Sequence, residues 1–99
     1  MSIVTIVAKL VVKEDAIKAV KAELQKLVEP TRQEEGCIDY RLHQDLHNPS
    51  TFIFYENWKD LASLNRHLDS PHYRRYVAVT GHQIKEKIVH KMQEVALHP

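Results

Sequence analysis

Two histidines in the second half of the chain are the residues best suited to acid–base chemistry. His67 stands three residues after Leu64 and one before Leu68, at the border of the apolar stripe that a helix would form here. Its imidazole could point into a cavity and act as a base, because its ordinary pKa lies near neutrality. The structural alternative is a half-exposed histidine that bonds to the backbone. His72 follows Pro71 in the first turn of a further helix, either as a second polar group at a pocket mouth or as a solvated side chain.

An acidic side chain stands among aromatic residues at 51–58. Phe54, Glu56 and Trp58 alternate and therefore share one face of a strand, and Tyr40 belongs to the matching face of the preceding strand. The rings could wall a pocket for a flat aromatic ligand, or they could be plain core packing in which the Tyr40 phenol needs a polar partner. Glu56 is either a base of raised pKa or the partner of a Lys, Arg or His.

Tyr73 and Tyr76 stand three residues apart on an expected helix. This spacing usually indicates packing, although either hydroxyl could orient a phenolic substrate. The surrounding segment, 72–76, mixes basic and aromatic residues as single-strand nucleic-acid binders do, but a solvated helix face is the expected reading.

Metal, thiol and nucleotide chemistry find little support. His43-x-Asp45-x-His47 could offer metal ligands, but its last member falls in a turn and seven histidines make such spacings common. Cys37 has no second cysteine or helix N-terminus to activate it. Two glycines cannot form a loop that cradles phosphates. We therefore expect no metal and no nicotinamide or flavin bound on a Rossmann unit, although a flavin could still act as a soluble co-substrate.

Changes of apolar period along the chain predict the elements that position these residues. Runs of β-branched or alternating apolar residues favour strands, and apolar residues recurring every three to four positions favour helices. The expected order is a strand at 3–12, a helix at 14–35, strands at about 37–45 and 51–58, helices at about 61–69 and 71–80, and a strand at about 86–96.

Local signals predict the ends of these elements. Asp60 and Ser70 are expected helix caps, and Gly36 is placed to end the first helix in a left-handed conformation.

The same patterns predict which faces are buried. The first strand, rich in β-branched residues, is expected to be buried on both faces over most of its length. The second strand should turn Ile38, Tyr40 and Leu42 inward, and the helix at 61–69 should turn Leu61, Leu64 and Leu68 inward.

The element order predicts an α+β fold. Two strand–helix–strand units give the ferredoxin-like split βαβ arrangement, a four-stranded antiparallel sheet with helices on one face. We expect one domain over residues 1–99, with a loose tail from about residue 97. The uncovered sheet face would present Ile53 and Tyr55 beside polar residues, so we expect a homodimer in which two sheets pack face to face into an α+β barrel.

Composition excludes several classes of protein. The 99 residues contain 14 Lys and Arg against 13 Asp and Glu, a net charge of +1 that gives no field for nucleic acid or an anionic membrane. The apolar start is too short to span a membrane and does not read as a signal peptide. A single cysteine cannot form an intrachain disulfide. The cytoplasm is the expected compartment.

Three segments form a recognisable pattern: Gly36-Cys-Ile-Asp-Tyr40, Tyr55-Glu-Asn-Trp-Lys-Asp60 and His67-Leu-Asp-Ser-Pro-His-Tyr73. Together with the element order, they resemble the antibiotic-biosynthesis-monooxygenase domain family. The resemblance reaches from the first strand to about Val95. It implies a small dimeric α+β barrel with a pocket between the sheet and the helices of each subunit.

The family resembled here includes cofactor-free monooxygenases of quinols and polycyclic phenols, a processing enzyme for phosphorylated autoinducer-2, and a haem-degrading branch. In the oxygenases the substrate loses a proton and reduces oxygen itself, so the resemblance implies no flavin or metal. The haem-degrading branch has a tryptophan where His67 stands, which argues against haem degradation here.

We therefore expect a cofactor-independent monooxygenase that combines O₂ with a small electron-rich aromatic such as a quinol. His67 would be the base or orienting group and His72 a second polar group. The expected substrate pocket comprises Tyr40, Phe54, Glu56, Trp58, Tyr73 and Tyr76. The alternatives are an isomerase or processing enzyme for a small phosphorylated signal metabolite, and a non-catalytic dimeric binding or stress-response module.

Overall fold

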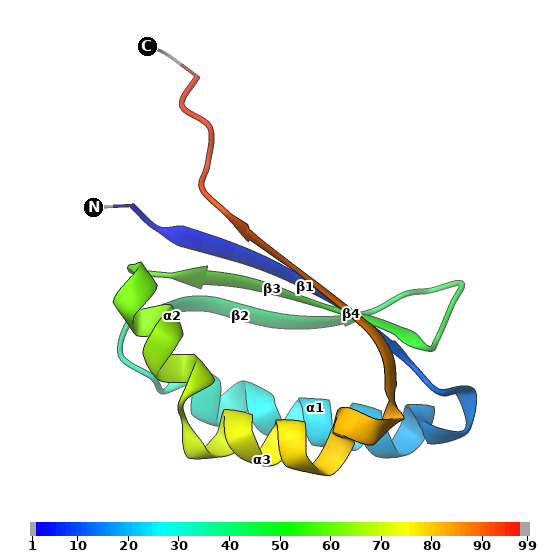
Figure 1. Ribbon diagram of the computed structural model, residues 1–99. Coiled ribbons are helices and arrows are strands. Elements are labelled where there is room, and N and C mark those ends of the chain that lie inside the picture. Colours follow the sequence, from blue (N-terminus) through cyan, green and yellow to red (C-terminus); the bar gives the residue numbers. More distant parts are fainter. Residues whose placement is uncertain (1, 98–99) are drawn as a thin grey trace.

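The computed structural model describes residues 2–97 and places a layer of helices against one face of a sheet (Figure 1). The elements are β1 (Val4–Val12), a 3₁₀ turn η1 (Glu14–Ala16), α1 (Ile17–Arg32), β2 (Cys37–Gln44), β3 (Thr51–Trp58), α2 (Leu61–Leu68), α3 (Pro71–Thr80), a 3₁₀ turn η2 (Gly81–Gln83) and β4 (Ile84–Met92). The expected order is confirmed. The last two residues of the tail expected to be loose, 98 and 99, lie outside the described residues.

The sheet has four strands in the order β2-β3-β1-β4, and every neighbouring pair is antiparallel. The first and third strands of the chain thus lie at the centre, and β2 and β4 form the edges. This is the ferredoxin-like α+β arrangement that the element order predicts. All three α-helices lie on the same side of the sheet, so its other face has no helix over it (Figure 1).

The core lies between the sheet and the helices. Alternate residues of β1, among them Ile6, Ala8 and Leu10, point to this side and are buried against residues such as Val20 and Leu24 of α1. The intervening residues of β1 are only partly buried. The prediction that both faces of this strand are buried is therefore wrong for the single chain, because the second face has no covering layer.

The expected helix caps are confirmed. The Asp60 carboxylate accepts a hydrogen bond from the Ser63 backbone N–H, and the Ser70 hydroxyl accepts one from that of Tyr73. Each bond satisfies a backbone donor that the first turn of a helix leaves free. These caps fix where α2 and α3 begin, and so fix the junction between them.

The first helix is shorter than predicted. A 3₁₀ turn replaces its first residues, and α1 ends at Arg32 with Pro30 still inside it. Two turn bonds then reverse the chain, from the Glu34 N–H to the Thr31 carbonyl and from the Cys37 N–H to the Glu34 carbonyl. Gly36 completes the reversal with a φ of +91°, the left-handed conformation expected for it.

A β-bulge corrects the predicted inner face of β2. The register against β3 shifts between Cys37 and Asp39, so Cys37 packs against the core while Ile38 is 51% exposed. The prediction that Ile38 points inward with Tyr40 is wrong, because the extra residue reverses the alternation at that point. Tyr40 itself is buried, as expected.

The inner face of α2 also differs from the prediction. Leu64 is buried, but Leu61 and Leu68 are nearly half exposed, and the buried positions beside Leu64 are Ser63 and His67. The helix is rotated relative to its leucine stripe because its short polar residues, rather than its leucines, lie over the end of the sheet and the turn at Gly36. His67 is consequently inside the protein and not at the border.

The last strand begins and ends earlier than predicted, at Ile84 and Met92. Its pairing with β1 runs from Val12 opposite Ile84 to Thr5 opposite Met92, one residue from the start of β1 at Val4. Residues 93–97 are not part of a strand and extend away from the sheet (Figure 1).

Candidate functional site

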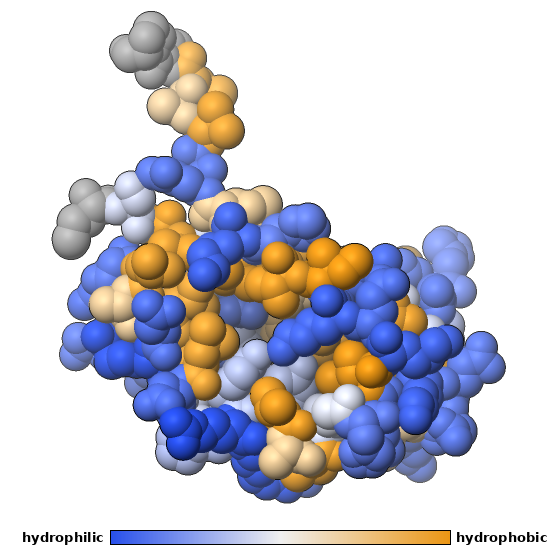
Figure 2. All heavy atoms as spheres, viewed as in Figure 1, coloured by the Kyte–Doolittle hydropathy of each residue, from blue (hydrophilic) through white to orange (hydrophobic). Residues whose placement is uncertain are grey.

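An apolar cleft lies between the helix-facing side of the sheet and the pair α2–α3. The cleft and the open space in front of it together measure about 510 Å³. Its aliphatic and aromatic walls are Ile6, Ala8, Leu10, Phe54, Leu64, Leu68 and Val89, and its polar residues are Glu56, His67, Tyr73, Tyr76, Lys87 and Lys91. Figure 2 shows apolar side chains gathered around a hollow between the sheet edge and the helices. A largely apolar cleft with a few converging polar groups is the usual form of a small-molecule site.

Two lysines of the edge strand stand at the cleft, on either side of Val89. The Lys87 ammonium donates a hydrogen bond of 2.8 Å to the Tyr73 hydroxyl. It also lies 5.3 Å from the centre of the Tyr73 ring and 5.6 Å from that of Tyr76. Lys91 is the second cation lining the same cleft. The cleft therefore combines an apolar interior with positive charge near its opening.

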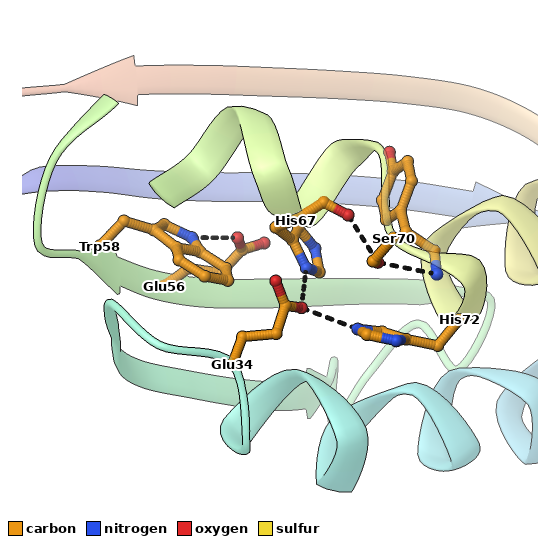
Figure 3. A network of polar contacts seen from close by, with 7 residues as sticks. Glu34, Glu56, Trp58, His67, Ser70 and His72 are labelled. Carbon is orange, nitrogen blue, oxygen red and sulfur yellow. Dashed lines mark hydrogen bonds and ion pairs between the residues drawn. The ribbon is translucent and has the colours of Figure 1, made fainter. Parts of the chain in front are cut away.

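A carboxylate joins the two histidines behind the cleft (Figure 3). Glu34 Oε2 lies 2.7 Å from His67 Nδ1 and 2.7 Å from His72 Nε2. A carboxylate oxygen can only accept, so both ring nitrogens carry hydrogen and donate to it. One oxygen atom thus fixes the orientation of two imidazoles that belong to different helices.

The chain folds locally to bring these three residues together. Ser70 connects α2 to α3, because its hydroxyl donates to the His67 carbonyl at 2.6 Å and accepts from the Tyr73 N–H. This places His67 in the last turn of α2 and His72 in the first turn of α3, both facing the turn after α1 (Figure 3). Glu34 reaches them from that turn.

His67 is neutral in this setting, although a carboxylate lies beside it. Burial lowers the pKa of the imidazole below its ordinary value, and this outweighs the opposite effect of Glu34. Since Nδ1 holds the single ring proton, Nε2 keeps its lone pair. Nε2 makes no hydrogen bond within residues 2–97, and His67 lines the cleft. The cleft is therefore lined by a neutral base, His67, whose Nδ1–H donates to the Glu34 carboxylate.

Glu56 is a buried acid inside the cleft. Its side chain accepts a hydrogen bond of 2.9 Å from the Trp58 indole N–H, and burial raises its pKa to about 7. Within residues 2–97 it forms no ion pair, so the predicted pairing with a Lys, Arg or His is absent from that part of the chain. Near neutral pH the group exists in both protonation states and can give or take a proton.

Glu56→Gln should make the protein relatively more stable as pH rises. The unfolded chain releases the Glu56 proton near 4.5 and the folded chain near 7. The neutral carboxyl therefore makes its whole contribution to the free energy of unfolding below pH 4.5. That contribution is lost as pH rises through the folded pKa of about 7. The shift of pKa corresponds to at most about 3 kcal/mol.

Glutamine stays neutral and can still accept from Trp58, so it should escape this loss. Urea unfolding of both proteins at about pH 4 and about pH 8 measures the difference. Glu35→Gln, whose side chain is 85% exposed, is the matched control and should show no pH-dependent difference. An equal effect of Glu56→Gln at both pH values would contradict the expectation.

The structure brings five of the predicted site residues into the cleft and leaves three outside it. His67, Phe54, Glu56, Tyr73 and Tyr76 line it. Tyr40 and Trp58 lie behind His67, with ring centres 5.5 and 4.7 Å from the imidazole, and hold it in place. His72 lies on the far side of Glu34.

Other predicted chemistry is placed elsewhere. Asp45 accepts hydrogen bonds from the backbone N–H groups of His47 and Asn48 and so closes the β2–β3 turn. Burial raises the pKa of the Cys37 thiol to about 11, so it remains protonated at neutral pH. The buried Tyr40 phenol has its pKa raised by burial beyond its usual range, and the neighbouring Thr31 hydroxyl is buried without a hydrogen-bond partner within residues 2–97.

Three polar residues of the site, Glu34, Lys87 and Lys91, are missed by the sequence patterns. Glu34 follows the apolar stripe of α1 and reads as a solvated residue, and Lys87 reads as a polar residue of an edge strand. A carboxylate placed two residues before an expected left-handed glycine, at a chain reversal, is the one signal for Glu34. The two lysines have no such signal, because their place on the inner face is seen only in the pairing of β4 with β1, where Leu10 lies opposite Lys87 and Ile6 opposite Lys91.

Comparison with known proteins decides the family. A family model described as antibiotic biosynthesis monooxygenase matches residues 3–79. The chain belongs to this family. The antibiotic biosynthesis monooxygenase match includes the Glu34–His67–His72 group and ends before β4, which supplies the lysines of the cleft.

Two curated relatives are similar over most of this chain. A Synechocystis protein described as uncharacterized is 31% identical over 75% of this chain, which spans half of that protein's length. A Mycobacterium tuberculosis protein, Rv0793, named as a candidate monooxygenase, is 32% identical over 79% of this chain and 76% of its own length.

A solved structure, PA3566 from Pseudomonas aeruginosa, superposes with a TM-score of 0.92 at 30% identity and covers 97% of each chain. The antibiotic biosynthesis monooxygenase fold is therefore shared along nearly the whole chain, β4 included. In residues 2–97 no helix has the length and apolar character needed to cross a membrane.

Proposed function

We propose that this chain is a cofactor-independent monooxygenase that oxidises a small electron-rich aromatic such as a quinol. The observation that carries the proposal is the neutral His67, held by Glu34 and lining an apolar cleft. Family membership supports the reaction class, and the lining of the cleft supports an aromatic substrate.

The first step is binding and loss of a proton. The ring of the substrate lies among Phe54 and the aliphatic residues of β1, which favour a flat apolar group. Its hydroxyl donates to His67 Nε2, which takes the proton. Glu34 then faces an imidazolium and stabilises it, as a carboxylate behind a catalytic histidine does in other enzymes.

The second step is stabilisation of the substrate anion. The Lys87 ammonium and the Tyr73 hydroxyl form one hydrogen-bonded pair at the cleft. A phenolate oxygen near this pair would find a positive charge and a hydroxyl donor. Because the interior of the cleft is apolar, this attraction is stronger there than in water.

The third step is reaction with oxygen. The electron-rich anion passes electrons to O₂, one oxygen atom becomes bonded to a ring carbon, and the other leaves as water. A quinol that becomes a hydroxyquinone supplies all four electrons, so the equation balances with O₂ as the sole co-reactant. His67 returns its proton to the departing oxygen.

Oxygen uptake by the metal-stripped protein with a panel of quinols tests this proposal. The expected result is uptake above the unaided oxidation of each quinol, with formation of the hydroxylated product. Turnover of a substrate without uptake of oxygen, or no turnover across the panel, would overturn it.

A second candidate is favoured by the two lysines. Lys87 and Lys91 could hold a phosphate at the cleft opening, so an isomerisation or processing step on a small phosphorylated metabolite also suits the site. Such a reaction would proceed without oxygen. A non-catalytic binding module would instead show ligand-dependent thermal stabilisation with no product.

We also propose that two copies pair through the uncovered sheet face. Tyr55 and Ile88 on that face are 40% and 41% exposed, and Val7 lies between their strands. Burying these side chains against a second copy would remove apolar surface from water.

Tyr55→Asp should therefore convert a dimer into a monomer at micromolar concentration, because it places a charge in the apolar contact. Sedimentation velocity measures the change. Val79→Asp is the control, since Val79 is 39% exposed but lies on α3, away from this face. A monomeric wild-type protein, or equal dissociation in both variants, would contradict this assembly.

A further inference from the structure

The group Glu34, His67 and His72 has the composition of a metal site. Their ligand atoms, one carboxylate oxygen and two imidazole nitrogens, all lie within 4.8 Å of one another. Two histidines and one carboxylate form a donor set that zinc and other divalent transition metals use in proteins. The His43-x-Asp45-x-His47 spacing singled out in the sequence does not contribute to it.

We propose that these three residues bind a divalent transition metal, zinc above all, and that the metal switches off His67 as a base. The proposal of metal binding depends only on the geometry of the three donor groups. The second half rests on the proposed function, in which His67 Nε2 accepts the substrate proton.

The two nitrogen–oxygen separations need little change to accept an ion, and the two nitrogens lie within 4.8 Å of each other. Metal–ligand bonds of about 2.0–2.2 Å place tetrahedral ligands about 3.3 Å apart. The two present nitrogen–oxygen separations are 2.7 Å, so the carboxylate and the rings must separate by about half an ångström. The residues come from three segments, the turn after α1 and the adjoining ends of α2 and α3, so small shifts of the helices suffice (Figure 3).

The site is partly accessible. The His67 side chain is nearly fully buried, while the His72 and Glu34 side chains retain 23% and 15% exposure. An ion can therefore enter from the His72 side, and a water molecule can complete the coordination there. The Trp58 ring packs at a tilted angle against His67, with ring centres 4.7 Å apart, and holds the imidazole in place.

The position of the His67 ring proton determines how a bound metal would affect catalysis. Without metal, His67 Nδ1 carries the proton and donates to Glu34, which leaves the Nε2 lone pair for the cleft. A metal on Nδ1 takes the lone pair there, so the single proton of the ring must lie on Nε2. His72 changes in the opposite sense, from Nε2–H to Nδ1–H. For two neutral rings no proton is released, and no electron is transferred. His67 then presents an N–H donor to the substrate and cannot accept its proton.

Metal binding can be tested without turnover. The metal-free full chain is titrated with Co²⁺ for visible absorption of a four-coordinate ion, and with Zn²⁺ against a chromophoric chelator. We expect one ion per chain, with binding lost in Glu34→Gln and His72→Gln and kept in the matched controls Glu35→Gln and His47→Gln. Circular dichroism checks that each variant is folded. Absence of stoichiometric binding, or binding that survives in both site variants, would overturn the proposal.

The switch is tested by nitrogen-15 NMR of the imidazole rings. We expect the His67 proton on Nδ1 in the metal-free protein and on Nε2 in the zinc form. With an active protein, zinc should also suppress substrate-dependent oxygen uptake. If the protein has no oxygenase activity, the titration and the tautomer still decide the metal site, so the two proposals fail separately. An unchanged tautomer with zinc bound would overturn the switch.

Discussion

His67→Ala should lower kcat of the proposed oxidation by at least roughly 100-fold, the usual minimum for removal of a general base. The imidazole is the one neutral base lining the cleft with a carboxylate fixed behind it. Alanine leaves the apolar walls and the lysines unchanged, so substrate should still bind while proton transfer slows. Oxygen uptake at saturating quinol, corrected for unaided oxidation, measures kcat.

Two further variants separate chemistry from packing. His67 is buried against Trp58, so alanine also leaves a cavity that weakens the fold. His67→Gln fills more of that space and can still donate to Glu34, but an amide is not a base, so it should lose as much activity as alanine. Glu34→Gln should keep the base but weaken its activation, with a loss of at least roughly tenfold.

His47→Ala is the control for this series, because His47 lies in the exposed β2–β3 turn far along the sheet from the cleft. It should leave kcat unchanged. Full activity in His67→Gln would remove His67 from the proposed mechanism, whatever happens to the stability of the protein.

Gly36→Ala should destabilise the fold by about 3 kcal/mol. Two costs combine at this position. The backbone has a φ of +91°, where an L side chain is strained, and a Cβ built there would lie 2.2 Å from Ser63 Oγ and 2.6 Å from Ser63 Cβ. Ser63 cannot rotate away freely, because its hydroxyl donates to Asp60 at 2.7 Å and accepts from Arg66 at 3.1 Å.

Thermal unfolding measures this effect, and for a chain of this length about 3 kcal/mol lowers Tm by roughly 10–20 °C. Gly81→Ala is the matched control, since a Cβ there meets nothing within 4 Å and the φ of −54° suits any residue. It should change stability by less than about 1 kcal/mol. Equal effects of the two substitutions would mean that the contact between Gly36 and α2 is unimportant.

Much of the fold follows from signals that are local in the sequence. The β-branched run of β1, the caps Asp60 and Ser70 and the left-handed Gly36 each act within a few residues, so the sequence alone places them. The face of β2 fails at Ile38 because a bulge adds one residue without a sequence signal. The reaction, substrate, cofactor independence and dimer remain predictions.

The site is harder to predict than the fold because it is made by distant residues. Glu34 and His67 are 33 positions apart and meet only when the turn after α1 packs under α2. The rotation of α2 that buries His67 beside Ser63 depends on that same contact at Gly36. The apolar periodicity of α2 predicts that its leucines face inward. That periodicity contains no information about the residues that α2 packs against.

The pairing of β1 with β4 has a consequence for how the protein folds. It joins residues near position 5 to residues near position 92, and β4 is the last of the four strands to be synthesised. Contacts so distant in sequence slow folding, because the long intervening chain must be ordered before they form. Until β4 arrives, β1 has one unpaired edge that can attract other chains. Chaperone dependence and aggregation during synthesis should therefore respond more to changes in β4 than to changes in the helices.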